Sequence, residues 1–486
     1  MTFHKRTLTR TVAWALGLLV ASASVVWAHD SGFGLARYTA DGALDQSFGT
    51  GGLVVTRSAQ RSFVANAVAL QSDGRILVAG MVSDLASASL QLAVARYNPD
   101  GSADDGFGSA GMAATLVGAA GGAASTLALQ PDGKILVAGT AFAHGSADDE
   151  FALARFTSAG QLDLSFGSEG IVTTHVGASG SAVQSVVLQP DERILVAGTA
   201  FSNGPTDDDF ALVRYMPDGR LDTGFGSGGI VTTDFSSGEA GGRPALDRAG
   251  GVAIESDGKI VVGGSTRGDH QAFAVARYNI DGSLDSSFGV GGKAQIPAEA
   301  PQVYAVIVQS SGDLVLAGTA GSLSGGTSPF AMARFLADGR ADLAFGSDGL
   351  VTTSFEGSRS GARAATTQAD GKLLIGGAKF GAPSAQGEAL PQSGFALARY
   401  TVDGRIDTGF GTSGRVMTNM GDAGATPLSL AVQPDGKIVA AGLVFFRVPA
   451  PSGPFDAATR LATPAAAIAL LIIGIVLASI LRHARH

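Results

Sequence analysis

The sequence predicts an all-β fold, a seven-bladed β-propeller of four-stranded antiparallel blades, with an N-terminal signal helix and a C-terminal transmembrane helix. A unit of about 60 residues recurs seven times in the 486-residue chain, and tandem repetition at such a period is typical of propeller blades. Each unit contains four short apolar runs separated by Asp-Gly turns. The composition agrees, because 70 glycines and 34 aspartates against 8 glutamates and 7 lysines favour turns over helix surfaces.

An arginine marks the same place in every unit, at intervals of 59, 59, 59, 63, 57 and 65 residues. Counting from this arginine, an aromatic residue follows at +1, glycine at +5, aspartate at +8, phenylalanine at +11, and glycine at +12 and +15. A second landmark, the turn QPDGK followed by a strand, also occurs seven times, with departures at Glu192 and at residues 310–313. The regularity indicates one structural unit repeated within the chain.

The first full unit shows the four predicted strands of a blade. They are Ala65–Leu70, Ile76–Ala79, Leu92–Tyr97 and Met112–Leu116. The mature chain instead begins with a third and a fourth strand, Phe33–Tyr38 and Leu53–Thr56, and finishes with a first and a second, Pro427–Val432 and Ile438–Gly442. Two half-units therefore complete a seventh blade, and pairing the two ends within it closes the ring and leaves no open edge.

The pattern LARYxxDGxLDxxFGxxG…ALQPDGKILVAG resembles the delta-60 repeat family of bacterial secreted propellers. The resemblance covers about residues 33–446. It implies a β-propeller, but it implies no general activity and offers no catalytic motif to carry over.

The N-terminal residues 1–28 have the features of a secretory signal peptide. Lys5, Arg6 and Arg10 give a basic start, an apolar stretch follows, and Val26-Trp27-Ala28 provides a small-residue cleavage site. The alternative is an uncleaved anchor, although the apolar stretch is short for a membrane span. We expect the propeller to occupy residues 29–446 of an exported chain.

The C-terminal part predicts a membrane anchor. Residues 447–464 contain four prolines and read as a stiff linker, residues 465–481 are uncharged and mostly apolar, and residues 482–486 form a basic tail. Seventeen residues lie at the lower limit for a spanning helix, and the basic end fits the cytoplasmic side. The expected location is the cell envelope, with the propeller outside the cytoplasm. The layout also resembles bacterial C-terminal sorting signals, so removal of the tail is the alternative.

The repeated arginine and the aspartate at +8 form the strongest chemical pattern. Planar arginine pairs well with a carboxylate, so a structural clamp that fixes the loop of every blade is the favoured interpretation. The functional alternative is a ring of seven carboxylates for cations. The pairs are Arg37 and Asp45, Arg96 and Asp104, Arg155 and Asp163, Arg214 and Asp222, Arg277 and Asp285, Arg334 and Asp342, and Arg399 and Asp407.

Loop lengths indicate where a ligand would bind. The QPDGK turns and the loops containing the +8 aspartate are nearly constant in length and lie on one face, whereas insertions around 236–250 and 381–392 go to the opposite face. Variable loops on a rigid scaffold are where recognition usually resides. The variable face also gathers acids that are not repeated, and it provides the tentative ligand site Asp148, Asp149, Glu150, Asp207, Asp208, Asp209, Asp269 and His270. These carboxylates form either a solvated rim or a calcium site, since clustered carboxylates suit hard cations.

Several classes of function are disfavoured. The chain has no cysteine, which removes thiolate chemistry, and residues 29–463 carry a net charge of about −14, which repels nucleic acid. We found no paired acid and base, so the sequence predicts neither an enzyme nor a resident cofactor. It favours a non-catalytic binding or scaffold protein of the envelope with an unknown protein or glycan ligand. The alternative is a hydrolase or lyase that acts on a polysaccharide through acids of the variable face.

Overall fold

The structure is a computed structural model, and it describes residues 29–58, 61–84, 89–143, 149–201, 208–235, 246–267, 271–321, 329–355, 359–380, 393–421 and 424–447. These residues form strands, turns and loops. The predicted signal helix (1–28), linker (447–464, apart from residue 447) and transmembrane helix (465–481) lie outside them. Within the described ranges, no helix has the length and apolar character needed to cross a membrane.

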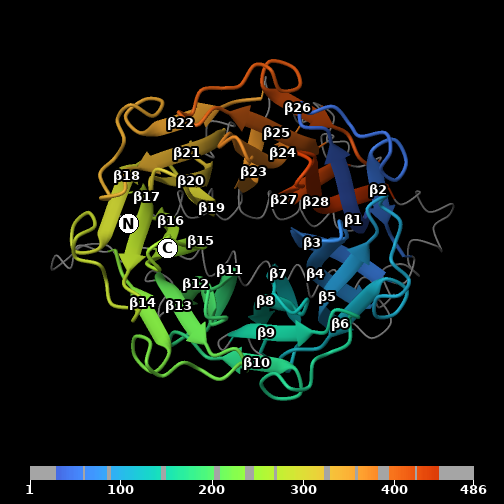
Figure 1. Cartoon of the computed structure of the whole chain (residues 1–486), viewed down its shortest axis with the longest axis horizontal. Coiled ribbons are helices and arrows are strands. Elements are labelled where there is room, and N and C mark those ends of the chain that lie inside the picture. Colours follow the sequence, from blue (N-terminus) through green and yellow to red (C-terminus); the bar gives the residue numbers. More distant parts are fainter. Residues whose placement is uncertain are drawn as a thin grey trace, which may run out of the picture.

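The strands form seven antiparallel sheets of four (Figure 1), which confirms the predicted seven-bladed propeller. Blade 1 contains β3 (Arg61–Leu70), β4 (Ile76–Asp84), β5 (Ser89–Tyr97) and β6 (Met112–Thr115). Blade 2 contains β7 (Gly122–Leu129), β8 (Ile135–Ala141), β9 (Glu150–Phe156) and β10 (Ile171–Thr174). Blade 3 contains β11 (Ser181–Leu188), β12 (Ile194–Phe201), β13 (Asp208–Tyr215) and β14 (Ile230–Thr233). Blade 4 contains β15 (Arg248–Ile254), β16 (Ile260–Thr266), β17 (Ala272–Tyr278) and β18 (Lys293–Pro297).

The remaining three blades complete the ring. Blade 5 contains β19 (Gln302–Val308), β20 (Leu314–Thr319), β21 (Phe330–Phe335) and β22 (Leu350–Thr353). Blade 6 contains β23 (Arg359–Thr367), β24 (Leu373–Phe380), β25 (Gly394–Tyr400) and β26 (Arg415–Thr418). Blade 7 joins both ends of the chain and contains β27 (Gly424–Val432), β28 (Ile438–Arg447), β1 (His29–Tyr38) and β2 (Leu53–Thr56).

Burial explains why the middle strands of a blade read as continuous apolar runs. Every residue of β8 is buried, because its two faces pack against two neighbouring blades, whereas β7 alternates between buried and partly exposed positions. The glycine of the ILVAG run is also required by packing. A Cβ atom on Gly139 would lie 2.0 Å from the carbonyl oxygen of Ala123 on β7, a distance that no side chain tolerates.

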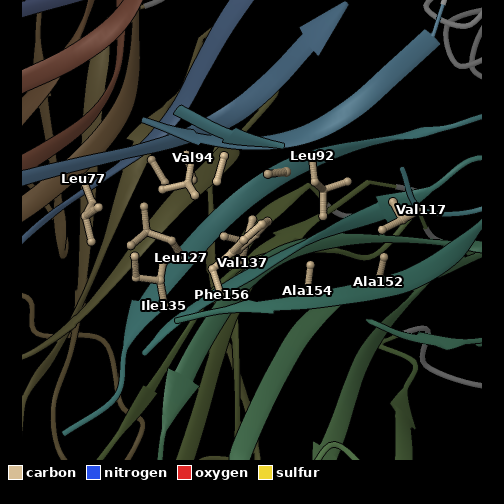
Figure 2. Close-up of a cluster of buried hydrophobic side chains, with 14 of the residues drawn as sticks. Leu77, Leu92, Val94, Val117, Leu127, Ile135, Val137, Ala152, Ala154 and Phe156 are labelled. Carbon is tan, nitrogen blue, oxygen red and sulfur yellow. The ribbon is translucent and has the colours of Figure 1, made fainter. Parts of the chain in front are cut away.

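The hydrophobic core lies between blades rather than within them. One cluster joins Leu77, Leu92 and Val94 of blade 1 to Ile135 and Val137 of blade 2 (Figure 2). A single four-stranded sheet cannot bury both of its faces, so each blade depends on its neighbours for apolar burial.

Blade 7 closes the ring by pairing the two ends of the described chain. The register between β1 and β28 runs from His29 opposite Arg447 to Tyr38 opposite Ile438. This is the closure that the phase of the sequence repeats predicts. Several strands extend beyond their predicted limits, because pairing continues past the apolar run toward the variable loops, as in β4 and β28.

Candidate functional site on the variable-loop face

The two faces of the ring carry different connections. We call the face with the turns between first and second strands and the loops between third and fourth strands the turn face; in blade 2 these are residues 130–134 and 157–170. The opposite face, with the second-to-third connections and the connections between blades, is the variable-loop face.

On the turn face, the repeated arginine and aspartate are in contact in all seven blades. The distance from arginine Nε to aspartate Oδ2 is 2.7 or 2.8 Å in every pair. Each arginine also stacks on the phenylalanine at +11, with its Cζ atom 4.3–4.6 Å from the ring centroid. The constant spacing within the units therefore gives each repeated arginine both a charge pair and a cation–π contact.

The same arginine links its blade to the next one, a role that sequence reasoning missed. Arg155 Nη1 donates to the carbonyl oxygen of Pro217 in blade 3 at 2.6 Å, and Arg399 Nη1 closes the ring by donating to the carbonyl oxygen of Ala40 at 2.5 Å. The equivalent arginines of the other blades donate to Pro99, Ser158, Ile280, Ala337 and Val402. Each clamp thus fixes a loop and an interface between blades.

The surroundings of Asp285 and Asp45, two of the clamp carboxylates, favour their ionised form. Burial raises the pKa of Asp285, but hydrogen bonds from Ser287 and the charge of Arg277 outweigh it and lower the pKa to about 2. In Asp45, the side-chain hydrogen bond from Ser47 is the largest influence and holds the pKa well below its usual range.

A cation from the QPDGK turn reaches the clamp aspartate in six of the seven blades. The pairs are Lys437–Asp45, Arg75–Asp104, Lys134–Asp163, Arg193–Asp222, Lys259–Asp285 and Lys372–Asp407, at 3.0–3.6 Å. Blade 5 departs from the pattern because Asp313 stands where the others have a basic residue. The carboxylates of the turn face are thus occupied by protein cations, which supports a structural role over a ring of cation ligands.

Half of the predicted ligand residues can be placed on the variable-loop face. Asp148, Asp207, Asp269 and His270 lie outside the described residues. Asp149 precedes β9, where its Oδ1 accepts a hydrogen bond from the Ala143 amide at 3.2 Å, and Glu150 begins β9. Asp208 and Asp209 begin β13.

Asp209 lies in a cluster with two carboxylates that sequence reasoning missed. Asp209, Asp234 and Asp247 each offer a carboxylate oxygen, and these atoms all lie within 4.8 Å of one another. It is the one group of this kind among the described residues. Asp234 follows β14 directly, and Asp247 precedes β15, so three strand ends of blades 3 and 4 bring the carboxylates together.

Local hydrogen bonds position this cluster. Asp247 is fully buried, its Oδ2 accepts from the Phe235 amide at 2.6 Å, and its own amide donates to the carbonyl oxygen of Asp208 at 2.8 Å. Arg248 lies 3.4 Å from the Asp208 carboxylate. The signal that could have found the two missed residues is their position, since Asp247 lies within the insertion at 236–250 and Asp234 lies two residues before it.

The arrangement has defined chemical capacities. Three carboxylate oxygens at this spacing match the oxygen ligands that calcium prefers, with further ligands supplied by carbonyl groups or water. Like charges so close together repel one another, and a divalent cation offsets that repulsion. Neighbouring carboxylates can also act as an acid and a base in catalysis.

Comparison with known proteins supports the fold. A model of a β-propeller domain of unknown function, DUF5122, matches residues 18–48, 71–107, 130–166, 189–225, 255–288 and 309–345. The later matches run from the QPDGK-type turn to about the phenylalanine at +11, so they coincide with the repeated unit. No curated protein matches the chain.

Solved structures with a similar fold are distant in sequence. A protein of unknown function from Dyadobacter fermentans has 12% identity and a TM-score of 0.39, covering 80% of this chain and 96% of its own. An ulvan lyase of polysaccharide lyase family PL25 has 11% identity and a TM-score of 0.44, covering 82% of this chain and 99% of its own. The polysaccharide lyase Uly1 has 10% identity and a TM-score of 0.39, covering 78% and 89%.

These neighbours correct one expectation. The prediction that the chain is not an enzyme is contradicted, because propellers similar in fold include polysaccharide lyases. With identities of 10–12% and TM-scores of 0.39–0.44, these likenesses assign no activity to this chain. Taken together, the matched segments and the seven blades support a β-propeller built from tandem repeats similar to DUF5122.

Proposed function

We propose that the chain is an exported envelope propeller of the delta-60 repeat type, which binds a ligand on its variable-loop face with calcium held by Asp209, Asp234 and Asp247. The observation that carries this proposal is the convergence of these three carboxylates within 4.8 Å. They come from separate strand ends at the site of an insertion, where recognition is expected on a repeat scaffold.

The placement of the acids favours a built site over a solvated rim. Asp247 is fully buried and anchored by the Phe235 amide, so the backbone fixes the geometry of one ligand before any cation arrives. Preorganised oxygen ligands lower the cost of ordering on binding. A solvated rim would instead present its carboxylates separately to water.

A calcium titration of the purified full chain, with the melting temperature as readout, tests the cation. We expect calcium to raise the melting temperature, because a ligand at 100 times its Kd stabilises the folded state by about 2.7 kcal/mol. The double variant Asp209→Asn and Asp247→Asn keeps the shape and acceptor oxygens and should lose the increase. Asp338→Asn is the matched control, since Asp338 is a turn-face carboxylate paired with Arg340. Equal melting of the parent with and without calcium would refute the cation.

The envelope location rests on the two chain ends. The basic and apolar start at 1–28 and the apolar stretch at 465–481 support export with a single anchor. Mass spectrometry of the protein from fractionated cells should find a mature N-terminus near His29 in the membrane fraction. An intact Met1 in a soluble fraction would contradict the export.

The second candidate is a hydrolase or lyase that acts on a polysaccharide at the same carboxylates. The presence of several neighbouring carboxylates favours it, because glycosidases use a pair of carboxyl groups as acid and as base or nucleophile, and three carboxylates meet in this cluster. Turnover on a panel of polysaccharides that disappears in the double asparagine variant would support catalysis. Binding without turnover would assign the face to recognition.

A further inference from the structure

Every inner strand contains one irregularity in its pairing, and the residue there differs from blade to blade. The inner strands β3, β7, β11, β15, β19, β23 and β27 surround the axis of the ring (Figure 1). In each, the register with the second strand skips one residue. The skipped residues are Asn66, Ser125, Gln184, Gly250, Tyr304, Arg363 and Leu428. Such bulges re-aim side chains at functional positions.

Two neighbouring members of this ring are in contact. The guanidinium of Arg363 lies over the Tyr304 ring, with Cζ 4.6 Å from the centroid, and its Nη1 donates to the phenol oxygen. The phenol in turn donates to Gln302 Oε1 at 2.8 Å. Arg363 is exposed, and of its five donors only one is used by a described residue.

A second arginine borders the same tyrosine. Arg267 follows β16, and its Nη2 is 3.5 Å from the carbonyl oxygen of Pro301, three residues before Tyr304. Burial lowers the pKa of Arg267, the charge of Arg248 acts in the same direction, and Tyr304 acts in the opposite one. Tyr304 of blade 5 thus lies near one arginine of blade 4 and one arginine of blade 6.

These arginines differ from those of the clamps. Among the residues that the structure describes, neither Arg267 nor Arg363 has a carboxylate within 4.0 Å, whereas each clamp arginine has one at 2.8 Å or less. Arg267 is partly buried, and a guanidinium in such a place is stabilised by a negative charge, which no described residue supplies within 4.0 Å. In a chain of net charge −9, an anionic ligand would supply that charge here and be repelled elsewhere on the acidic surface.

We propose that Arg363 and Arg267, at the end of the central axis that opens on the variable-loop face, bind a carboxylate group of an acidic saccharide ligand. The inference rests on the proposed function and names the chemical class of its ligand. The planar fork of arginine matches the two oxygens of a carboxylate, and Tyr304 holds the Arg363 fork in place by stacking. Blades 3 and 4 carry the carboxylates, and blades 4 to 6 carry the arginines, so one acidic ligand could contact calcium at one end and guanidinium at the other.

Isothermal titration calorimetry of the purified full chain tests this site, with trigalacturonate as the probe and neutral galactotriose as its matched control. We expect trigalacturonate to bind, galactotriose to bind at least about tenfold more weakly, and Arg363→Gln to lose about tenfold in affinity for trigalacturonate. Arg340→Gln, an exposed arginine of the turn face, should bind like the parent. Arg363 is exposed, so its replacement should leave the fold intact; Arg267→Gln is the second variant, and circular dichroism checks that it folds.

Each contrary result has a separate meaning. Absence of trigalacturonate binding, or unchanged affinity in folded Arg363→Gln, overturns the inference. A different outcome is that galactotriose binds as tightly as trigalacturonate and loses affinity in the double variant Asp209→Asn and Asp247→Asn. That result overturns the claim that the ligand is acidic but keeps the proposed function. Monomeric galacturonate and inorganic sulfate test whether the bound anion belongs to a saccharide chain. Binding of the trimer alone indicates a polysaccharide ligand. Equally tight binding of the monomer or of sulfate overturns the claim that the ligand is a saccharide.

Discussion

The turn face and the variable-loop face of this propeller use charged residues in opposite ways. On the turn face, arginine contacts aspartate and phenylalanine at nearly the same distances in each of the seven blades. On the variable-loop face, Asp209, Asp234 and Asp247 come from three different positions of two blades. Their cluster occurs at one place among the described residues and is not repeated from blade to blade. In a repeat protein, a residue that recurs serves the repeated architecture, whereas one that does not recur is free to serve a site.

The largest expected effect comes from breaking the ring that the turn face holds together. A chain truncated after Asn419 lacks β27 and β28, so β1 and β2 lose the partner strand of blade 7 and Asp45 loses Lys437. Because blades bury their faces only against neighbours, we expect loss of the cooperative transition seen for the parent in thermal denaturation. A chain ending at Arg447 keeps all 28 strands and serves as the control. Unchanged cooperative melting of the shorter chain would contradict the role of closure.

A smaller loss should follow removal of one clamp. Arg155→Met leaves the buried Asp163 without its main partner and removes the link to Pro217 in the next blade. Breaking a buried pair in this way costs about 3 kcal/mol of unfolding free energy, as measured by urea denaturation. Arg220→Met is the control, because Arg220 pairs with Asp218 on the surface with 77% of its side chain exposed, and such pairs contribute less than about 1 kcal/mol. Equal costs for the two variants would refute the clamp.

Acid should destabilise the fold by protonating carboxylates of the turn face. The folded pKa of Asp285 is about 2, against about 3.9 in an unfolded chain, so its contribution to stability is complete above about pH 4 and is lost as the pH falls toward 2. Asp285→Asn should be less stable than the parent at pH 7 but should lose less stability between pH 5 and pH 2. Melting curves across this range check the difference. Parallel losses in parent and variant would show that Asp285 does not contribute to acid sensitivity.

The smallest expected effect on stability belongs to the variable-loop face without calcium. Asp234→Asn removes one of three neighbouring negative charges at an exposed position, so in EDTA the unfolding free energy should stay within about 0.5 kcal/mol of the parent or rise slightly. Urea denaturation measures it. A loss comparable to that of Arg155→Met would mean that this face also holds the fold together.

Sequence periodicity was sufficient to predict the blades and their closure. The strict spacing from Arg37 to Phe48, repeated in every unit, placed strands and loops in register, and the two half-units indicated which strands would pair. Strand ends were underestimated, because backbone pairing in β4 and β28 continues beyond the apolar residues.

The site was only partly predictable. Asp209 was identified from its unrepeated acidic run, but Asp234 and Asp247 are single aspartates at strand ends, and their meeting depends on how blades 3 and 4 are packed. The contact between Tyr304 and Arg363 was missed for a similar reason. These residues lie 59 positions apart at matching bulges, and only the stacking of neighbouring inner strands brings them together.

The central claim is that the turn face supports the fold and the variable-loop face binds the ligand. A calcium titration tests it most directly, with the parent, Arg155→Met and Asp247→Asn as the three proteins. The readout is the melting temperature of each with and without saturating calcium. The division of roles predicts that Arg155→Met melts below the parent in EDTA yet gains as much as the parent from calcium, while Asp247→Asn loses the gain. Loss of the calcium response in Arg155→Met with retention in Asp247→Asn, or no response in the parent, would contradict it.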